Sequence, residues 1–136
     1  MKQRAVQRVR PLRKIRSLDD ARKLFAQLSA DARAERLQVA HLDAQNVLLG
    51  LQLRFGSAPS AVELPLRAII TEALRLHSAA LIVAHNHPSG DPQPSRADID
   101  MTRELVQAAR PIGVTVQDHL IFAGDQLVSF RELGLL

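Results

Sequence analysis

Hydrophobic residues recur at helical spacing in two segments of the chain. From Leu18 onward, apolar side chains follow at intervals of three and four residues, and Ser17 ahead of them is a residue type that caps helices. From Leu66 onward a second stripe has the same spacing, and Pro65 suits the first position of a helix. A third helix is expected over residues 95–110. The pattern therefore predicts three helices that are well separated along the sequence.

Strand patterns occupy most of the sequence between the expected helices. Residues 35–42 alternate between apolar and polar side chains, and a turn composition at 43–46 lets residues 47–55 return as an antiparallel partner. The apolar run at 81–84 predicts a strand that is covered on both faces. Further strands are expected over residues 62–64, 114–122 and 127–130. Helices interleaved with strands and hairpins predict an α/β domain with a mixed sheet.

Composition narrows the chemistry that this domain can perform. The chain has 136 residues, enough for one domain, and only 3% are aromatic, which disfavours a base-stacking surface for single-stranded nucleic acid. The absence of cysteine excludes disulfides, thiolate catalysis and cysteine-based zinc sites, so a metal must be held by histidine, carboxylate or water. No apolar run approaches the roughly 20 residues that span a bilayer, and no signal-peptide core is seen. We therefore expect a cytoplasmic protein without membrane contact.

Positive charge is concentrated at the N-terminus. The first 16 residues contain seven lysines and arginines and no acids, although the formal net charge of the whole chain is only +4. The other residues hold 11 bases and 14 acids, a formal charge of −3. We expect residues 1–16 to form a flexible basic tail ahead of a domain over residues 17–136. Such a tail can contact nucleic acid or another acidic partner, although a solvated leader without a partner explains it equally well.

The strongest chemical signal is the segment HNHPSGDPQPSRADID, residues 85–100. His85 and His87 are two residues apart at the end of the buried strand, so both side chains point to one side and can converge on an ion. The helix expected from Ser95 places Asp98 in its first turn, where the carboxylate can face the histidines. Two imidazoles and one carboxylate leave a fourth position for water, as in catalytic zinc sites, where zinc lowers the pKa of that water to about 7.

The same residues also have a purely structural interpretation. Ser95 and Asp98 match a capping box, in which the two residues satisfy each other's backbone N–H groups at the start of a helix. A single histidine is more often a hydrogen-bonded side chain than a ligand. The two interpretations are compatible, because Ser95 can cap the helix while Asp98 binds a metal.

The segment resembles the JAMM metal motif, His-x-His-Pro followed after six residues by Ser-x-x-Asp. Together with DHLIFAG and SFRELGLL, the region from about residue 34 to residue 136 resembles RadC-like proteins of the JAMM/MPN superfamily. The resemblance implies a single MPN domain, a mixed curved sheet flanked by helices in a layout related to deaminases. It implies one zinc ion per chain, bound by His85, His87 and Asp98. It also implies that Ser95 donates a hydrogen bond to the developing oxyanion or to the bound water, and that the substrate is a peptide or isopeptide bond in a protein or peptide.

The chain departs from the family's pattern where catalysis is concerned. Counting back from the histidines without gaps places the family's acid/base glutamate at Gln52, which can orient a water but cannot accept its proton. No glutamate occurs between Glu35 and Glu63, and Glu63 is an imperfect substitute. His119 and its neighbour Asp118 follow a family pattern, and we expect them to be structural or to orient a ligand.

Three functions follow from these observations. The first is a zinc-dependent metallohydrolase of JAMM type. The second is a zinc-binding pseudoenzyme that serves as a protein-interaction module, with Gln52 marking the lost chemistry. The third is a DNA-associated accessory factor, which the basic tail and the DNA-repair name of RadC-like proteins favour. RadC proteins also generally carry an N-terminal helix-hairpin-helix-type region, and the sequence predicts only one short helix ahead of the first strand.

Overall fold

The computed structural model describes residues 13–26, 33–55 and 65–136 of the chain. The strand expected over residues 62–64, and Glu63 within it, lie outside these residues. The elements in chain order are α1 (Leu18–Leu24), β1 (Arg36–Leu42), β2 (Leu48–Phe55), α3 (Leu66–Leu76), β3 (Ala80–Asn86), α4 (Arg96–Ala109), the short 3-10 helix η1 (Arg110–Ile112), β4 (Thr115–Ala123) and β5 (Gln126–Ser129).

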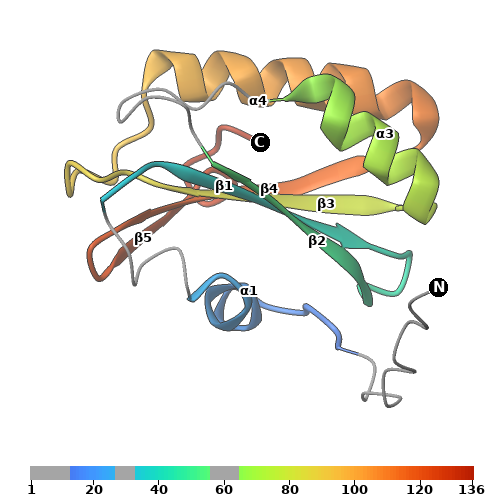
Figure 1. Cartoon of the computed structure of the whole chain (residues 1–136), viewed down its shortest axis with the longest axis horizontal. Helices are drawn as coiled ribbons and strands as arrows, with labels where there is room; N and C mark the ends of the chain where they lie inside the picture. Colours follow the sequence, from blue (N-terminus) through green and yellow to red (C-terminus); the bar gives the residue numbers. More distant parts are fainter. Residues whose placement is uncertain (1–12, 27–32, 56–64) are drawn as a thin grey trace, which may run out of the picture.

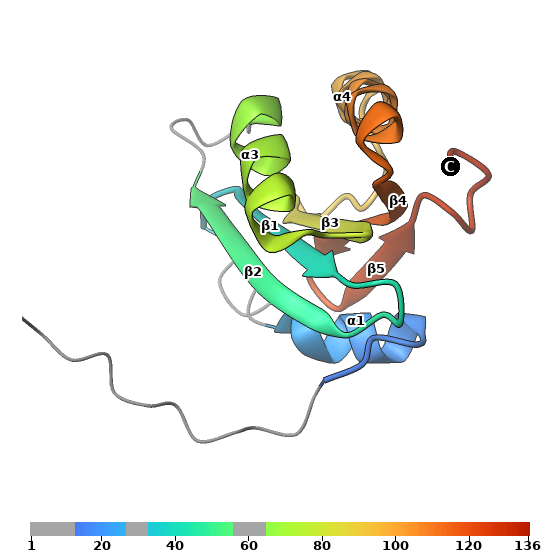
Figure 2. The ribbon, with the colours of Figure 1, turned by 90° about the vertical axis from the view of Figure 1, so that its right-hand side faces the viewer.

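The five strands form one mixed sheet in the order β2-β1-β3-β4-β5. Only β3 and β4 are parallel, and α4 connects them, whereas β1/β2 and β4/β5 are antiparallel hairpins. Helices α3 and α4 cover one face of the twisted sheet and α1 covers the other (Figures 1 and 2). These observations confirm the predicted α/β class with a mixed sheet flanked by helices.

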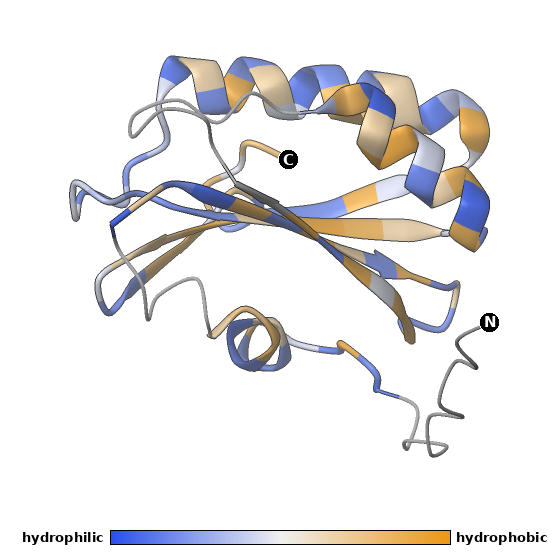
Figure 3. Cartoon of the chain, viewed as in Figure 1, coloured by the Kyte–Doolittle hydropathy of each residue, from blue (hydrophilic) through white to orange (hydrophobic). Residues whose placement is uncertain are grey.

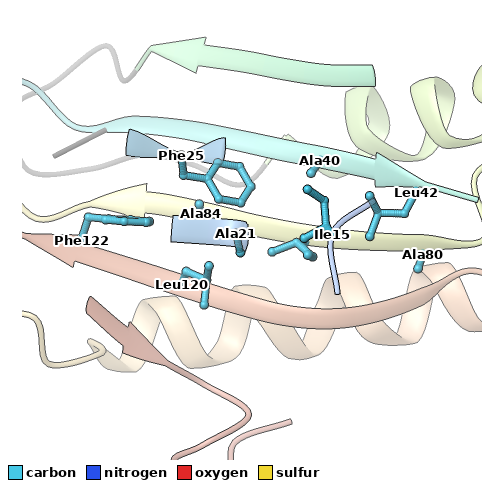
Figure 4. Close-up of a cluster of buried hydrophobic side chains, with 10 residues drawn as sticks. Ile15, Ala21, Phe25, Ala40, Leu42, Ala80, Ala84, Leu120 and Phe122 are labelled. Carbon is cyan, nitrogen blue, oxygen red and sulfur yellow. The ribbon is translucent and has the colours of Figure 1, made fainter. Parts of the chain in front are cut away.

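Each face of the sheet has its own hydrophobic core. On the α1 side, side chains of β1, β3 and β4 pack around Phe25 and Ile15 (Figure 4). On the other side, the apolar stripes of α3 and α4 pack against alternate residues of the same strands, with Leu105 fully buried. Hydrophilic and hydrophobic residues alternate along α4 (Figure 3), and its charged residues other than Asp98 are exposed. Strand β3 is buried along its whole length because it lies between the two cores, as its apolar sequence predicts.

The packed domain begins earlier than residue 17. Lys14 forms a β-bridge with Val47, and the backbone N–H of Ile15 donates to the carbonyl of Asn46. The Ile15 side chain is only 4% exposed and belongs to the core under α1. Burial of this isoleucine attaches residues 13–16 to the sheet, which corrects the predicted tail boundary. Residues 1–12 of the basic segment lie outside the described residues, so its contact with nucleic acid stays a prediction.

The described helices are short. The longest of them, α4, has 14 residues and one polar side. Within residues 13–26, 33–55 and 65–136, no helix is long and apolar enough to cross a membrane.

Candidate metal centre

Three polar side chains converge where β3 ends and the chain leads toward α4. His85 lies in β3, and His87 continues the extended course because its N–H donates to the carbonyl of Phe122 in β4. The Nε2 atoms of the two histidines are 2.8 Å apart. Asp98 approaches from α4, with Oδ2 at 3.1 Å from Nε2 of His87 and Oδ1 at 3.4 Å from Nε2 of His85. The structure thus brings together all three residues that the sequence proposes as ligands.

The start of α4 holds the Asp98 carboxylate in this position. Its Oδ2 accepts a hydrogen bond of 2.8 Å from the backbone N–H of Ser95, and the Ser95 hydroxyl oxygen accepts the N–H of Asp98 at 3.0 Å. Both halves of the capping box are therefore present, and the carboxylate that completes the cap also faces the histidines. Burial alone would raise the pKa of Asp98, but hydrogen bonds that His85 and His87 donate when their Nε2 atoms carry a proton, together with the Ser95 N–H, outweigh burial and hold that pKa well below its ordinary range.

Sequence reasoning missed a fourth residue in this group, Glu35. Glu35, His85 and His87 each offer one ligand atom, and these three atoms all lie within 4.8 Å of one another. Strand β1 pairs antiparallel with β3, with Leu37 opposite His85, so extending this register by two residues sets Glu35 opposite His87. The pairing of these two strands, unknown from the sequence, is the signal that would have identified it.

The neighbouring Asn86 fixes the backbone around Glu35. Its Oδ1 accepts the N–H of Arg36 at 2.6 Å, and its Nδ2 donates to the carbonyl of Ala34 at 2.9 Å. Asn86 is 2% exposed, so the clamp is internal to the fold. Within the described part of the chain, Oε2 of Glu35 is buried and has no hydrogen-bond partner. Leaving a carboxylate oxygen buried and unsatisfied is unfavourable, which indicates that another group belongs beside it.

The hydrogen-bond partners of His87 indicate that the group that belongs beside Glu35 is a cation. Its Nδ1 lies 2.8 Å from the carbonyl of Asp91, which can only accept, so Nδ1 carries the hydrogen. A neutral His87 therefore presents the lone pair of Nε2 to His85 and Asp98. The site needs a cation among two imidazoles and two carboxylates. A proton can fill this role, since the hydrogen bond with Asp98 raises the pKa of His87 despite burial. The nitrogen and oxygen donors also fit zinc.

Gln52 does not join this group. It lies on the edge strand β2, where its Oε1 is 2.6 Å from Nε2 of His41 and its Nε2 donates to the carbonyl of Ala68 at 3.2 Å. Strand β1 separates β2 from β3, and the residue opposite Gln52 on β1 is Val39. The placement of the acid/base group at Gln52 is therefore corrected. Counting residues back from the histidines without gaps does not show that β1, and not β2, pairs with β3, the strand that carries His85.

His41 is the centre of a buried polar cluster with Gln52. The ring is fully buried, and its Nδ1 lies 2.9 Å from the hydroxyl of Ser78. The Gln52 amide nitrogen already donates to a backbone carbonyl, so Oε1 faces the ring and Nε2 of His41 carries the hydrogen. The cluster ties β1 to the edge strand and to α3.

This cluster predicts a dependence of stability on pH. Burial lowers the pKa of His41 from its ordinary value of 6.5, so the unfolded chain binds this proton more readily than the folded chain. The free energy of unfolding should therefore fall as pH drops below about 6.5. The substitution His41→Gln should cost about 1 kcal/mol at pH 7.5 and flatten the acid-side decline, without abolishing it because His119 is also buried. Urea unfolding from pH 8 to pH 5 measures both; an unchanged slope in His41→Gln would contradict the assignment.

An apolar groove of about 540 Å³ borders the loop between His87 and α4. Asp91, whose carbonyl contacts His87, lines it, and so does Ile99, which follows Asp98. The apolar residues of the groove are Pro92, Pro94, Ile99, Val128, Leu133 and Leu135. The groove therefore borders the loop whose Asp91 carbonyl contacts His87, but none of the proposed ligands lines it.

Comparison with known proteins places this geometry in context. The sequence model of the RadC-like JAB domain family matches residues 15–135. The chain is 45% identical over 116 residues to UPF0758 protein Bpet3149 of Bordetella petrii, 43% identical over 102 residues to UPF0758 protein YfjY of Escherichia coli, and 39% identical over 121 residues to a UPF0758 protein of Roseiflexus castenholzii. These matches cover 85%, 75% and 89% of this chain, and 51%, 64% and 52% of the relatives. The chain thus spans about half to two thirds of the length of these relatives.

Proposed function

Because the chain belongs to the RadC-like JAB domain family, we propose that it is a zinc-dependent hydrolase that cleaves peptide or isopeptide bonds. The observation that carries the proposal is the convergence of Nε2 of His85, Nε2 of His87 and the Asp98 carboxylate, with a second carboxylate, Glu35, beside them. The donor set fits one zinc ion per chain. The activity of the longer relatives as whole proteins is part of the same proposal.

His85, His87 and Asp98 are the proposed ligands. A zinc ion bound by them would act as a Lewis acid toward a carbonyl and lower the pKa of a coordinated water to about 7. Asp98 is already ionised and held by the Ser95 N–H, so little rearrangement is needed at the helix. The Nδ1–H of His87 donates to the Asp91 carbonyl, which orients its Nε2 toward His85 and Asp98, where an ion would bind.

Glu35 is the proposed proton acceptor. Its Oε2 is buried without a hydrogen-bond partner among the described residues, which leaves it able to accept a proton from the attacking water and to return one to the leaving amine. The clamp by Asn86 fixes the backbone that carries it. Ser95 keeps the role expected for it: its oxygen accepts the N–H of Asp98, and its O–H is chemically still a donor for an oxyanion.

The groove beside the metal centre supports a peptide as substrate. Its apolar lining suits a hydrophobic side chain of the substrate, and the groove borders the loop whose Asp91 carbonyl contacts His87. The pseudoenzyme alternative depended on Gln52 standing at the acid/base position. With a carboxylate from Glu35 beside the histidines, the enzyme is the better supported of the two.

Metal removal tests this function. The purified chain should contain about one zinc per molecule and should hydrolyse members of a library of peptides and isopeptides, with a preference for apolar residues next to the cleaved bond. A chelator should abolish hydrolysis, and added zinc should restore it. Elemental analysis and chromatography of the products provide the measurements. A zinc-free protein that fails to take up zinc, or hydrolysis that survives chelation unchanged, would refute the proposal.

A further inference from the structure

His119 lies directly behind the candidate metal centre. It is on β4, 2% exposed, and its ring stacks on Phe130 with centroids 4.4 Å apart. Its Nε2 is 2.6 Å from Nδ1 of His85, the nitrogen that faces away from the other ligands. Its Nδ1 is 2.6 Å from the hydroxyl of Thr102, which lies one turn after Asp98 in α4. Both nitrogens of this buried ring are thus engaged in short hydrogen bonds.

The direction of each hydrogen bond can be assigned from Thr102. Its hydroxyl donates its single hydrogen to the carbonyl of Asp98 at 2.7 Å, and so Oγ1 must accept from His119. The hydrogen of His119 therefore lies on Nδ1. His119 is buried away from water, where a positive charge would be unfavourable, and so Nε2 has no hydrogen and accepts from Nδ1 of His85. His85 is left with its lone pair on Nε2.

We propose that His119 and Thr102 are positioning residues that fix His85 in the Nδ1–H tautomer, so that its Nε2 lone pair points at the metal site. The chain of donors runs from His85 through His119 and Thr102 to the backbone carbonyl of Asp98. It therefore links a ligand on β3 to a ligand on α4 and fixes both. The value of this arrangement for metal binding rests on the proposed function, whereas the tautomer itself is a property of the metal-free fold.

The hydrogen bond from His85 to His119 pre-organises His85 as a metal ligand. Without the acceptor on His119, the His85 ring would exchange between tautomers, and one of them places a hydrogen where the metal should bind. Partners of this kind behind a ligating histidine typically contribute about 10–100-fold to metal affinity. We therefore expect zinc affinity to depend on two residues that do not touch the ion.

Paired variants separate positioning from packing. The substitution His119→Leu removes the acceptor, whereas His119→Gln keeps one, because the glutamine carbonyl oxygen reaches about the place of Nε2 and can only accept. At the next link, Thr102→Val removes the hydroxyl at nearly constant volume, and Thr102→Ser retains it. Should His119→Leu fail to fold, the Thr102 pair alone still tests the chain of hydrogen bonds.

The readouts are the His85 tautomer and the zinc affinity. Long-range proton–nitrogen NMR of the metal-free full chain distinguishes protonated from unprotonated ring nitrogens. Wild type, His119→Gln and Thr102→Ser should show Nδ1–H at His85, and His119→Leu and Thr102→Val should show a mixture. Zinc affinity, measured by competition with a chromophoric chelator, should fall by about 10–100-fold in His119→Leu, less in Thr102→Val, and recover in the two conservative variants.

The outcomes distinguish this proposal from the proposed function. An unaltered Nδ1–H tautomer at His85 in both His119→Leu and Thr102→Val would overturn the positioning role, whatever the activity of the protein. An altered tautomer supports the positioning role even in a protein that never binds zinc, and in that case only the proposed function fails. Equal losses of zinc affinity in His119→Leu and His119→Gln would also overturn it, because packing and not the acceptor would then matter.

Discussion

The substitution Glu35→Gln is expected to lower peptide or isopeptide hydrolysis by about 10²–10⁴-fold while leaving the zinc content near one per chain. Glutamine has nearly the same shape as glutamate, but its amide cannot accept the proton of the attacking water. The three proposed ligands, His85, His87 and Asp98, are left intact. The rate constant kcat should therefore fall with little change in KM, which single-turnover kinetics and elemental analysis can measure.

A matched variant on the neighbouring strand provides the control. The substitution Gln52→Glu supplies the carboxylate that an ungapped motif count would require, but Gln52 contacts His41 and Ala68 and not the histidine pair. We expect no gain of hydrolysis in Gln52→Glu and no recovery in Glu35→Gln/Gln52→Glu. If Gln52→Glu raised activity severalfold, Glu35 would lose its assigned role. Loss of zinc in Glu35→Gln would instead make Glu35 a ligand.

Zinc affinity should fall steeply in the His87→Ala variant. Removing a ligand should lower the affinity more than removing a group that only orients a ligand, so we expect a fall of more than about 100-fold. The remaining His85 and Asp98 cannot complete a catalytic zinc site, which normally has three protein ligands. Chelator competition measures the affinity, and hydrolysis should disappear with the metal.

A histidine elsewhere in the chain serves as the control for this experiment. His77 is exposed at the end of α3, and its φ of 54° makes asparagine a better replacement than alanine. The substitution His77→Asn should leave zinc affinity and hydrolysis unchanged. Zinc retained at full affinity in His87→Ala would exclude the proposed ligand set.

Much of the fold could be predicted because its signals are local. Ser17 and Ser95 cap helices at the predicted residues, and the apolar run of β3 predicts its burial on both faces. The motif around His85 likewise needs only a strand end and a helix start, because both histidines and Asp98 come from one continuous segment. Local spacing is sufficient wherever the partners are close in sequence.

The missing part depends on contacts between distant segments. Glu35 reaches the histidines only because β1 inserts between β2 and β3, and that order of strands is not encoded in any local pattern. His119 is behind His85 because β4 is parallel to β3. Ile15 packs against the sheet, but it is flanked by basic residues, and a basic segment of this composition is typical of a flexible tail.

Anomalous diffraction at the zinc absorption edge, from crystals of the zinc-loaded protein, tests the central claim most directly. We predict one peak per chain, bonded to Nε2 of His85, Nε2 of His87 and a carboxylate oxygen of Asp98 at about 2.0–2.2 Å, with Glu35 close by but outside the set of ligands. A peak at any other group of residues, or no peak at this one, would contradict the assignment of a zinc hydrolase.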